Sequence, residues 1–127
     1  MVTVDTLVSG GAVVSPTGIQ KLDIGIQNGK IYSLTTPGTH LEAAKTIDAR
    51  GRFILPGGVD AHVHTRDPGQ THKEDFGTLS RAAATGGVTT IMCQPTTSPP
   101  INSVEMFNQV LEDWPKKSVV DFAIQPM

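Results

Sequence analysis

The spacing of apolar and polar residues divides the chain into two regions that meet near residue 52. In the first region, short apolar runs are separated by polar turns, and residues 21–26 alternate with a period of two. Such alternation is typical of a β-strand with one buried face. The pair Asn28-Gly29 follows and favours a tight hairpin turn. We therefore expect residues 1–52 to form a small all-β domain, with His40 in a solvated loop.

From residue 53 onwards, predicted strands alternate with predicted helices. Strands are expected in the apolar run that leads to His62 and at residues 88–93 and 119–125. This alternation is the pattern of βαβ units with a parallel sheet, so the expected fold class is α/β. Three strands cannot close a barrel, which takes about 250 residues in total. Either the sequence is part of a longer protein, which we favour, or a partner covers the open sheet.

Two amphipathic helices are expected between these strands. The first has Thr71 as its N-cap with Glu74 three residues later, and it ends at Gly86-Gly87. The second is capped by Asn102 and ends at Pro115. The apolar positions expected to face the core are Phe76, Leu79 and Ala83 in the first helix and Val104, Phe107, Leu111 and Trp114 in the second.

Candidate chemistry is concentrated where the first of these strands ends, at His62, His64 and Arg66. Side chains alternate along a strand, so these three residues should point to the same side. Two neighbouring imidazoles are suited to bind a metal ion, and a guanidinium binds a carboxylate through two parallel hydrogen bonds. A His-x-His pair also occurs by chance, and Arg66 could instead pair with Asp67 on the surface. The Pro-Gly turn that follows favours a site, because α/β barrels carry their chemistry at the carboxyl ends of their strands.

Composition narrows the expected partners and compartment. The chain has 10 Lys+Arg and 12 Asp+Glu, a net charge of -2, and Lys116-Lys117 is its only pair of adjacent basic residues. We therefore expect neither nucleic acid nor a membrane as a partner. The single cysteine, Cys93, excludes an internal disulfide and is expected in the core. The N-terminus lacks the basic and apolar segments of a signal peptide, so a cytoplasmic protein is expected.

The residues around the histidine pair resemble a known family. The segment Gly57-Gly58-Val59-Asp60-Ala61-His62-Val63-His64 is similar to the metal-binding strand of the amidohydrolase superfamily, and its continuation through Arg66 and Pro68-Gly69 is closest to dihydroorotase. The resemblance covers most of residues 54–101. It implies a zinc-dependent cyclic amidohydrolase, with residues 1–52 as a small β-sandwich and residues 53–127 as the first strands and helices of an incomplete (β/α)8 TIM barrel.

The resemblance also implies roles for individual residues. His62 and His64 would bind zinc in a site for one or two ions, and Arg66 with Thr96 would bind the substrate. Asp60 would orient a metal ligand, or would instead make a hydrogen bond at the strand end. The remaining ligands and the catalytic base are expected beyond Met127, so this polypeptide alone should be inactive and should bind zinc weakly.

The implied reaction opens or closes the ring amide that relates dihydroorotate to N-carbamoyl-L-aspartate in pyrimidine synthesis. Thr96 stands where dihydroorotases have an asparagine that helps to bind the substrate carboxylate, and this difference leaves allantoinase- or hydantoinase-type substrates open. Arg66 favours a dihydroorotase-type substrate over these alternatives. A further hypothesis is a non-catalytic relative that serves as a scaffold. The resemblance also implies a homo-oligomer or an assembly with another enzyme of the pyrimidine pathway.

Overall fold

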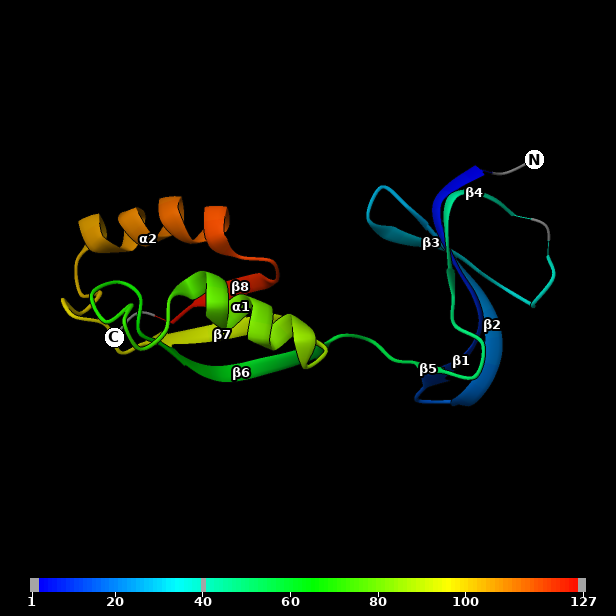
Figure 1. The fold of residues 1–127 in the computed structure, drawn as a ribbon, viewed down its shortest axis with the longest axis horizontal. Coiled ribbons are helices and arrows are strands. Elements are labelled where there is room, and N and C mark those ends of the chain that lie inside the picture. The colour runs from blue at the N-terminus through cyan, green and yellow to red at the C-terminus, as the bar shows by residue number, and fades with distance from the viewer. Residues whose placement is uncertain (1–2, 40, 126–127) are drawn as a thin grey trace. The chain divides into compact units, whose positions relative to one another are not determined.

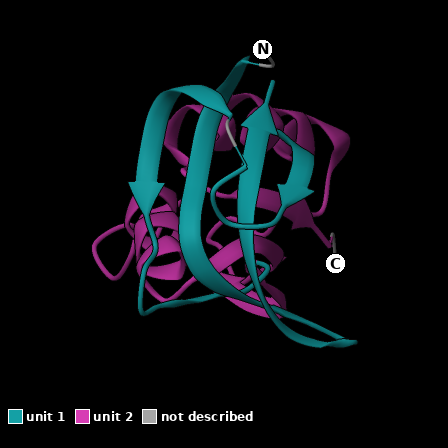
Figure 2. Cartoon of the chain, turned by 90° about the vertical axis from the view of Figure 1, so that its right-hand side faces the viewer, with its two compact units in different colours: residues 1–56 teal, residues 57–127 magenta. Residues whose placement is uncertain are grey.

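The structure, a computed structural model, describes residues 3–39 and 41–125 (Figure 1). It divides into two compact units, residues 1–56 and residues 57–127 (Figure 2). His40, which is expected in a loop, lies outside the described residues. Within the described part of the chain, no helix is long and apolar enough to cross a membrane.

In its described residues, 3–39 and 41–56, the first unit contains one mixed sheet of five strands. These strands are β1 (Thr3–Ser15), β2 (Gly18–Gln27), β3 (Lys30–Thr35), β4 (Glu42–Asp48) and β5 (Phe53–Ile54). Their order is β3-β2-β1-β4, and β5 pairs with the later part of β1. The neighbours β1, β2 and β3 run antiparallel, whereas β4 and β5 run parallel to β1.

The hairpin predicted at Asn28-Gly29 is confirmed. Gln27 of β2 pairs with Lys30 of β3, so the two residues between them form the turn. Both turn residues have a positive φ, 52° for Asn28 and 71° for Gly29, as a type I′ turn requires. The Asn28 N–H donates to the carboxylate of Asp5 at 2.6 Å, which ties the turn to β1.

Over residues 57–125, the second unit consists of a parallel sheet with two helices, and it confirms the α/β class. Its elements are β6 (Gly58–Thr65), α1 (Phe76–Thr85), β7 (Val88–Pro95), α2 (Val104–Lys117) and β8 (Asp121–Ile124). The strand order is β6-β7-β8, and both pairings are parallel. The apolar run that leads to His62 is not one strand, because β5 and β6 are separated by residues 55–57. Pro56 explains this break, since proline has no N–H to donate to a strand ladder.

Helix α1 begins later than predicted. Its N-cap is Asp75 and not Thr71. The Asp75 carboxylate accepts a hydrogen bond from the Thr78 N–H at 2.8 Å, and the Thr78 hydroxyl accepts one from the Asp75 N–H at 3.2 Å. Asp75 directly precedes Phe76, which is fully buried, whereas Thr71 lies in an exposed turn. The helix therefore begins where its first apolar residue enters the core. It ends at Thr85 with Gly86 as its C-cap, in agreement with the predicted stop at Gly86-Gly87.

Helix α2 differs from the prediction at both ends. Its N-cap is Ser103 and not Asn102, and it continues through Pro115 to Lys117. A proline inside a helix removes one backbone hydrogen bond, and here that loss falls in the last turn, where helices fray. The helix therefore ends at Lys117, two residues after the predicted end at Pro115.

The buried face of α2 is also rotated from the predicted one. Val110 and Trp114 are buried, whereas Val104 is 72% exposed and Leu111 is 43% exposed. The observed stripe and the predicted stripe both have helical spacing, and they share Phe107 and Trp114. The sequence pattern alone cannot choose between two such stripes, because the choice depends on what the helix packs against.

The core of the second unit is built around aromatic rings. Phe76 of α1 stacks on Trp114 of α2, with ring centroids 4.2 Å apart and planes inclined by 9°. Phe122 of β8 meets the two rings edge-on at 5.1 Å and 5.8 Å. The buried cluster consists of Phe76, Ile91, Cys93, Ile101, Val110 and Trp114. It therefore joins both helices to the sheet.

Replacing Trp114 with alanine should destabilise the protein strongly, because the ring is fully buried between two other aromatic rings. We expect Trp114→Ala to lower the free energy of unfolding by about 3–5 kcal/mol in urea denaturation. The control Val104→Ala, at an exposed position of the same helix, should change it by less than about 0.5 kcal/mol. Equal effects of the two substitutions would contradict this packing.

Candidate functional site

The two histidines of β6 lie side by side at the carboxyl end of the parallel sheet. The Nε2 atoms of His62 and His64 are 3.3 Å apart, and their rings meet edge-on with centroids separated by 5.0 Å. Both side chains are exposed. The same-side arrangement that alternation predicts for this pair is therefore present in the structure.

Gln94 of β7 contacts both imidazole rings. Its backbone carbonyl oxygen lies 3.1 Å from Nδ1 of His64, and its side-chain Nε2 lies 2.7 Å from Nδ1 of His62. Strand pairing explains this position, because Gln94 is the register partner of His64 across the two strands. Both rings thus have their Nδ1 atoms engaged by one residue while their Nε2 atoms face each other.

This arrangement fits a metal ion held through the two Nε2 atoms. Two nitrogen ligands at about 2.0–2.1 Å from a tetrahedral zinc ion are about 3.3 Å apart, and the observed separation is 3.3 Å. Metal-binding histidines commonly donate their other ring N–H to an oxygen atom. Nδ1 of His64 can donate in this way to the Gln94 carbonyl oxygen, and Nδ1 of His62 contacts the Gln94 side-chain amide. Within the described residues, no third His, Cys, Asp or Glu joins the pair to form a group of three. The pair would therefore supply only part of a three- or four-ligand site.

Asp60 lies close to the pair but contacts the backbone. Its carboxylate accepts a hydrogen bond from the His62 N–H at 3.1 Å. The pairing of β6 with β7 shifts register between Asp60 and Val63, so this hydrogen bond spans an irregular part of the strand. Asp60 thus holds the backbone from which the first imidazole projects.

Arg66 and Thr96, the two residues expected to bind substrate, lie next to each other after their strands. An Arg66 guanidinium nitrogen, Nη1, is 3.5 Å from the backbone oxygen of Thr96, and the side-chain amide of Gln70 donates to that same oxygen at 3.2 Å. The Thr96 hydroxyl donates to the backbone oxygen of Thr65 at 3.2 Å. Because its only proton is used there, this hydroxyl can offer a ligand only an acceptor.

The loops that follow β6 and β7 are tied to each other. The Thr96 N–H donates to the Thr65 oxygen at 3.1 Å, and the Ser98 N–H donates to the Pro68 oxygen at 3.3 Å. Gly69 has a φ of 90°, and a Cβ atom there would lie 1.6 Å from the Ser98 oxygen. Only glycine allows this approach, which explains the Pro-Gly turn after Arg66.

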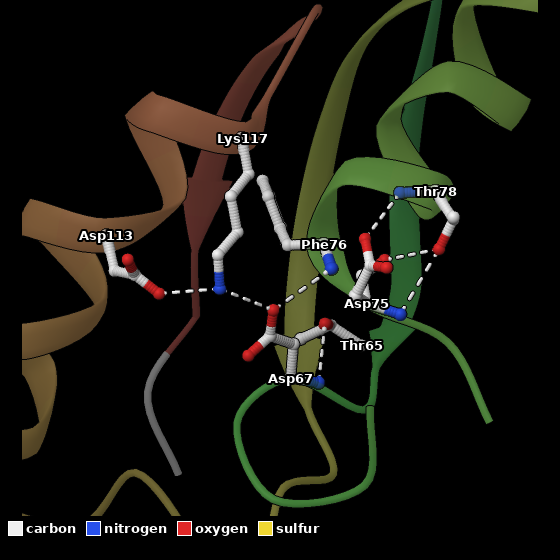
Figure 3. A network of polar contacts seen from close by, with 7 residues as sticks. All are labelled: Thr65, Asp67, Asp75, Phe76, Thr78, Asp113 and Lys117. Atoms are coloured by element: carbon white, nitrogen blue, oxygen red, sulfur yellow. Dashed lines mark hydrogen bonds and ion pairs between the residues drawn. The ribbon is translucent and has the colours of Figure 1, made fainter. Parts of the chain in front are cut away.

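Asp67 anchors the Arg66 loop to both helices (Figure 3). Its carboxylate is 5% exposed and accepts hydrogen bonds from the Phe76 N–H at 3.1 Å and the Lys117 ammonium at 2.9 Å. Lys117 also pairs with Asp113 at 2.6 Å. The pKa of Lys117 is raised above its usual value, first by its hydrogen bond to Asp113 and also by its hydrogen bond to Asp67. Arg66 therefore projects from a loop that α1 and α2 hold in place.

The sequence does not indicate the roles of Gln94, Gln70 or the network around Asp67. Gln94 lies in a predicted strand, and the signal for its role is the register between the two strands. The link from Asp67 to Lys117 spans 50 residues and depends on how α2 packs. Neither signal is available from local spacing.

Removing the Lys117 charge should destabilise the protein, because it leaves the buried Asp67 carboxylate with one hydrogen-bond donor fewer. We expect Lys117→Met to lower the free energy of unfolding in urea by about 1–3 kcal/mol. The exposed neighbour Lys116 offers a matched control. Lys116→Met should change the free energy of unfolding by less than about 0.5 kcal/mol. If Lys117→Met unfolds at the same urea concentration as the wild type, the contact between Lys117 and Asp67 does not contribute to stability.

Cys93, next to Gln94, is a buried core residue, as predicted. Burial raises the pKa of its thiol from 9.0 to about 11. The thiolate is the reactive form, so a buried thiol with this pKa is a poor nucleophile at neutral pH. The Cys93 thiol of the unfolded chain loses its proton at a lower pH than the thiol of the native protein. The free energy of unfolding should therefore fall as the pH rises from 9.0 to about 11.

Cys93 should therefore resist alkylation in the native protein. At pH 8, iodoacetamide should label the native thiol at least about a hundredfold more slowly than the thiol in denaturant, because of burial and the reduced thiolate fraction. Mass spectrometry of the peptide that contains Cys93 measures both rates. Comparable rates would contradict the buried position.

Comparison with known proteins identifies the family. The family model described as Dihydro-orotase-like matches residues 51–123. The dihydroorotase of Streptococcus pneumoniae is 44% identical over 115 residues, which cover 89% of this chain and 27% of that protein. The allantoinase of Deinococcus radiodurans is 38% identical over 127 residues, which cover 96% of this chain and 27% of that protein. The structure of L-hydantoinase from Arthrobacter aurescens matches with a TM-score of 0.89 and 35% identity, covering 97% of this chain and 28% of that chain.

These relatives are hydrolytic enzymes of the amidohydrolase superfamily. Within that superfamily, the chain belongs to the dihydroorotase-like family. The resemblance found in the sequence around His62 and Arg66 is thereby confirmed. The chain spans 27% of the length of the pneumococcal dihydroorotase.

Proposed function

We propose that the protein containing this chain is a metal-dependent cyclic amidohydrolase that interconverts dihydroorotate and N-carbamoyl-L-aspartate. The observation that carries the proposal is the pair of facing Nε2 atoms of His62 and His64, with Arg66 on the loop directly after their strand. Membership of the dihydroorotase-like family supports it.

The proposed function implies a barrel larger than the unit described here. We propose the second unit, from β6 onwards, as the first part of a (β/α)8 barrel and the first unit as the small β domain that precedes it. The boundary then lies after β5, which pairs with β1, and not at residue 52 as the sequence indicates. The parallel order β6-β7-β8, with a helix between each pair of strands, is the repeating arrangement of such a barrel. The further metal ligands and the catalytic base would come from later strands.

The chain's own residues would bind the metal and position the substrate. His62 and His64 would hold zinc through Nε2, and Gln94 would keep both rings in orientation. Bound zinc would polarise the ring carbonyl and activate water for attack on it. Arg66 would bind the substrate carboxylate and fix the ring over the reacting centre, which removes part of the barrier by positioning.

A second candidate is hydrolysis of an allantoin- or hydantoin-type ring. The observation that favours it is the Thr96 hydroxyl, whose proton is already donated to Thr65 and cannot be donated to a carboxylate. The allantoinase and L-hydantoinase relatives also fit this candidate. A non-catalytic scaffold is the remaining hypothesis, and activity measurements separate it from both.

The test is ring opening of dihydroorotate, allantoin and hydantoin by the intact protein, before and after removal of metal and readdition of zinc. We expect dihydroorotate to be opened with the highest kcat/KM, and we expect activity to be lost on chelation and restored by zinc. Preference for either of the other rings would establish the second candidate. Inactivity on all three with zinc present would overturn the proposal and favour the scaffold.

Arg66→Lys should impair dihydroorotate turnover, because a lysine cannot form the two parallel hydrogen bonds of a guanidinium. We expect kcat/KM for dihydroorotate to fall by about tenfold or more, because both the binding and the positioning of the ring are impaired. Arg81→Lys, at an exposed position of α1, is the matched control and should keep wild-type values. Turnover of dihydrouracil, the same ring without the carboxylate, should be insensitive to Arg66→Lys. Equal losses on both rings would contradict the assigned role.

A further inference from the structure

We propose that Gln94 is the positioning residue that orients both site histidines: its backbone fixes the tautomer of His64, and its side chain hydrogen-bonds His62 in either tautomer. The inference rests on the proposed role of His62 and His64 as metal ligands. It goes beyond that role by assigning their control to one residue of the neighbouring strand.

The backbone of Gln94 determines the tautomer of His64. A carbonyl oxygen can only accept a hydrogen bond, and the Gln94 oxygen lies 3.1 Å from Nδ1 of His64. Nδ1 therefore carries the proton in the neutral ring, and Nε2 of His64 presents a free lone pair. This contact does not depend on the Gln94 side chain, because it comes from the strand backbone.

The side chain of Gln94 hydrogen-bonds Nδ1 of His62. As oriented in the structure, the amide nitrogen faces Nδ1 of His62 at 2.7 Å and donates to it. The proton of the neutral ring then lies on Nε2, which faces the free lone pair of His64 at 3.3 Å. In this state the two imidazoles bind each other, and His62 has no lone pair to offer a metal ion.

Turning the amide by half a revolution exchanges its oxygen and nitrogen with almost no change in shape. The oxygen then accepts from Nδ1–H of His62, and both Nε2 atoms present lone pairs to the same point. Gln94 can thus satisfy the metal-free pair and the metal-binding pair in turn. A residue with only donors or only acceptors would satisfy one of them.

The position of Gln94 is well defined on both sides. It is the register partner of His64, and the next residue, Pro95, is buried opposite Thr65. Thr96 then donates to the Thr65 oxygen through both its N–H and its hydroxyl. The backbone that carries the amide is therefore held against β6, so the amide can reach His62 without a change in the strand.

The experiment measures zinc affinity of the intact protein by competition with a chelator, and the visible absorption of the cobalt(II) form. Gln94→Met keeps the size of the side chain but removes its hydrogen bond to His62. We expect it to weaken zinc binding about tenfold and to change the cobalt(II) spectrum. Gln94→Glu should stay within about threefold of wild type or bind more tightly, because a carboxylate accepts from Nδ1–H and enforces the metal-binding tautomer.

Two reference variants make the outcome decisive. Gln109→Met carries the same substitution on an exposed part of α2 and should bind zinc as the wild type does. His62→Asn removes a ligand and should lose more affinity than Gln94→Met. Wild-type affinity in Gln94→Met, or equal losses in Gln94→Met and Gln94→Glu, would overturn the inference while leaving the proposed function intact. A wild-type protein that binds no zinc would overturn the proposed function itself, and the inference with it.

Discussion

Parallel pairing between β6 and β7 is the constraint on which the candidate site depends. The pairing places His64 opposite Gln94 and Thr65 opposite Pro95, so that both strands end at the same level. The register shift between Asp60 and Val63 precedes the second histidine, and pairing is regular from Val63 to Thr65. A slip by one residue would turn the side chains of a strand to its other face and would separate the imidazoles from their glutamine partner.

Local sequence signals were sufficient for the elements of the fold whose causes are local. The turn at Asn28-Gly29 needs two residues that tolerate positive φ, and the sequence supplies both. The α/β pattern after residue 53 follows from alternating strand and helix periodicity. The predicted first residues of both helices were wrong, because several neighbouring polar residues can act as an N-cap. The predicted buried face of α2 was wrong, because two stripes of helical spacing share Phe107 and Trp114. Contacts with the rest of the core decide between such alternatives.

Some features of the candidate site also follow from local sequence signals, and others do not. The pairing of His62 with His64 follows from their spacing on one strand, and the closeness of Arg66 to Thr96 follows from the shared carboxyl edge of a parallel sheet. Gln94 could not be recognised without the register, since any residue of β7 is compatible with the local pattern. Thr96 illustrates a different limit, because its identity is visible in the sequence but the use of its proton on Thr65 is not.

The anchor of the Arg66 loop has a consequence for the order in which the protein matures during synthesis. Asp67 leaves the ribosome 50 residues before Lys117, the ammonium that neutralises its buried carboxylate. Until α2 has emerged and docked, that carboxylate lacks its cationic partner, and burying it is unfavourable. The guanidinium-bearing loop therefore acquires its final shape late, when the second helix of the nascent chain is complete. A loop is thus organised by a segment that is translated after it.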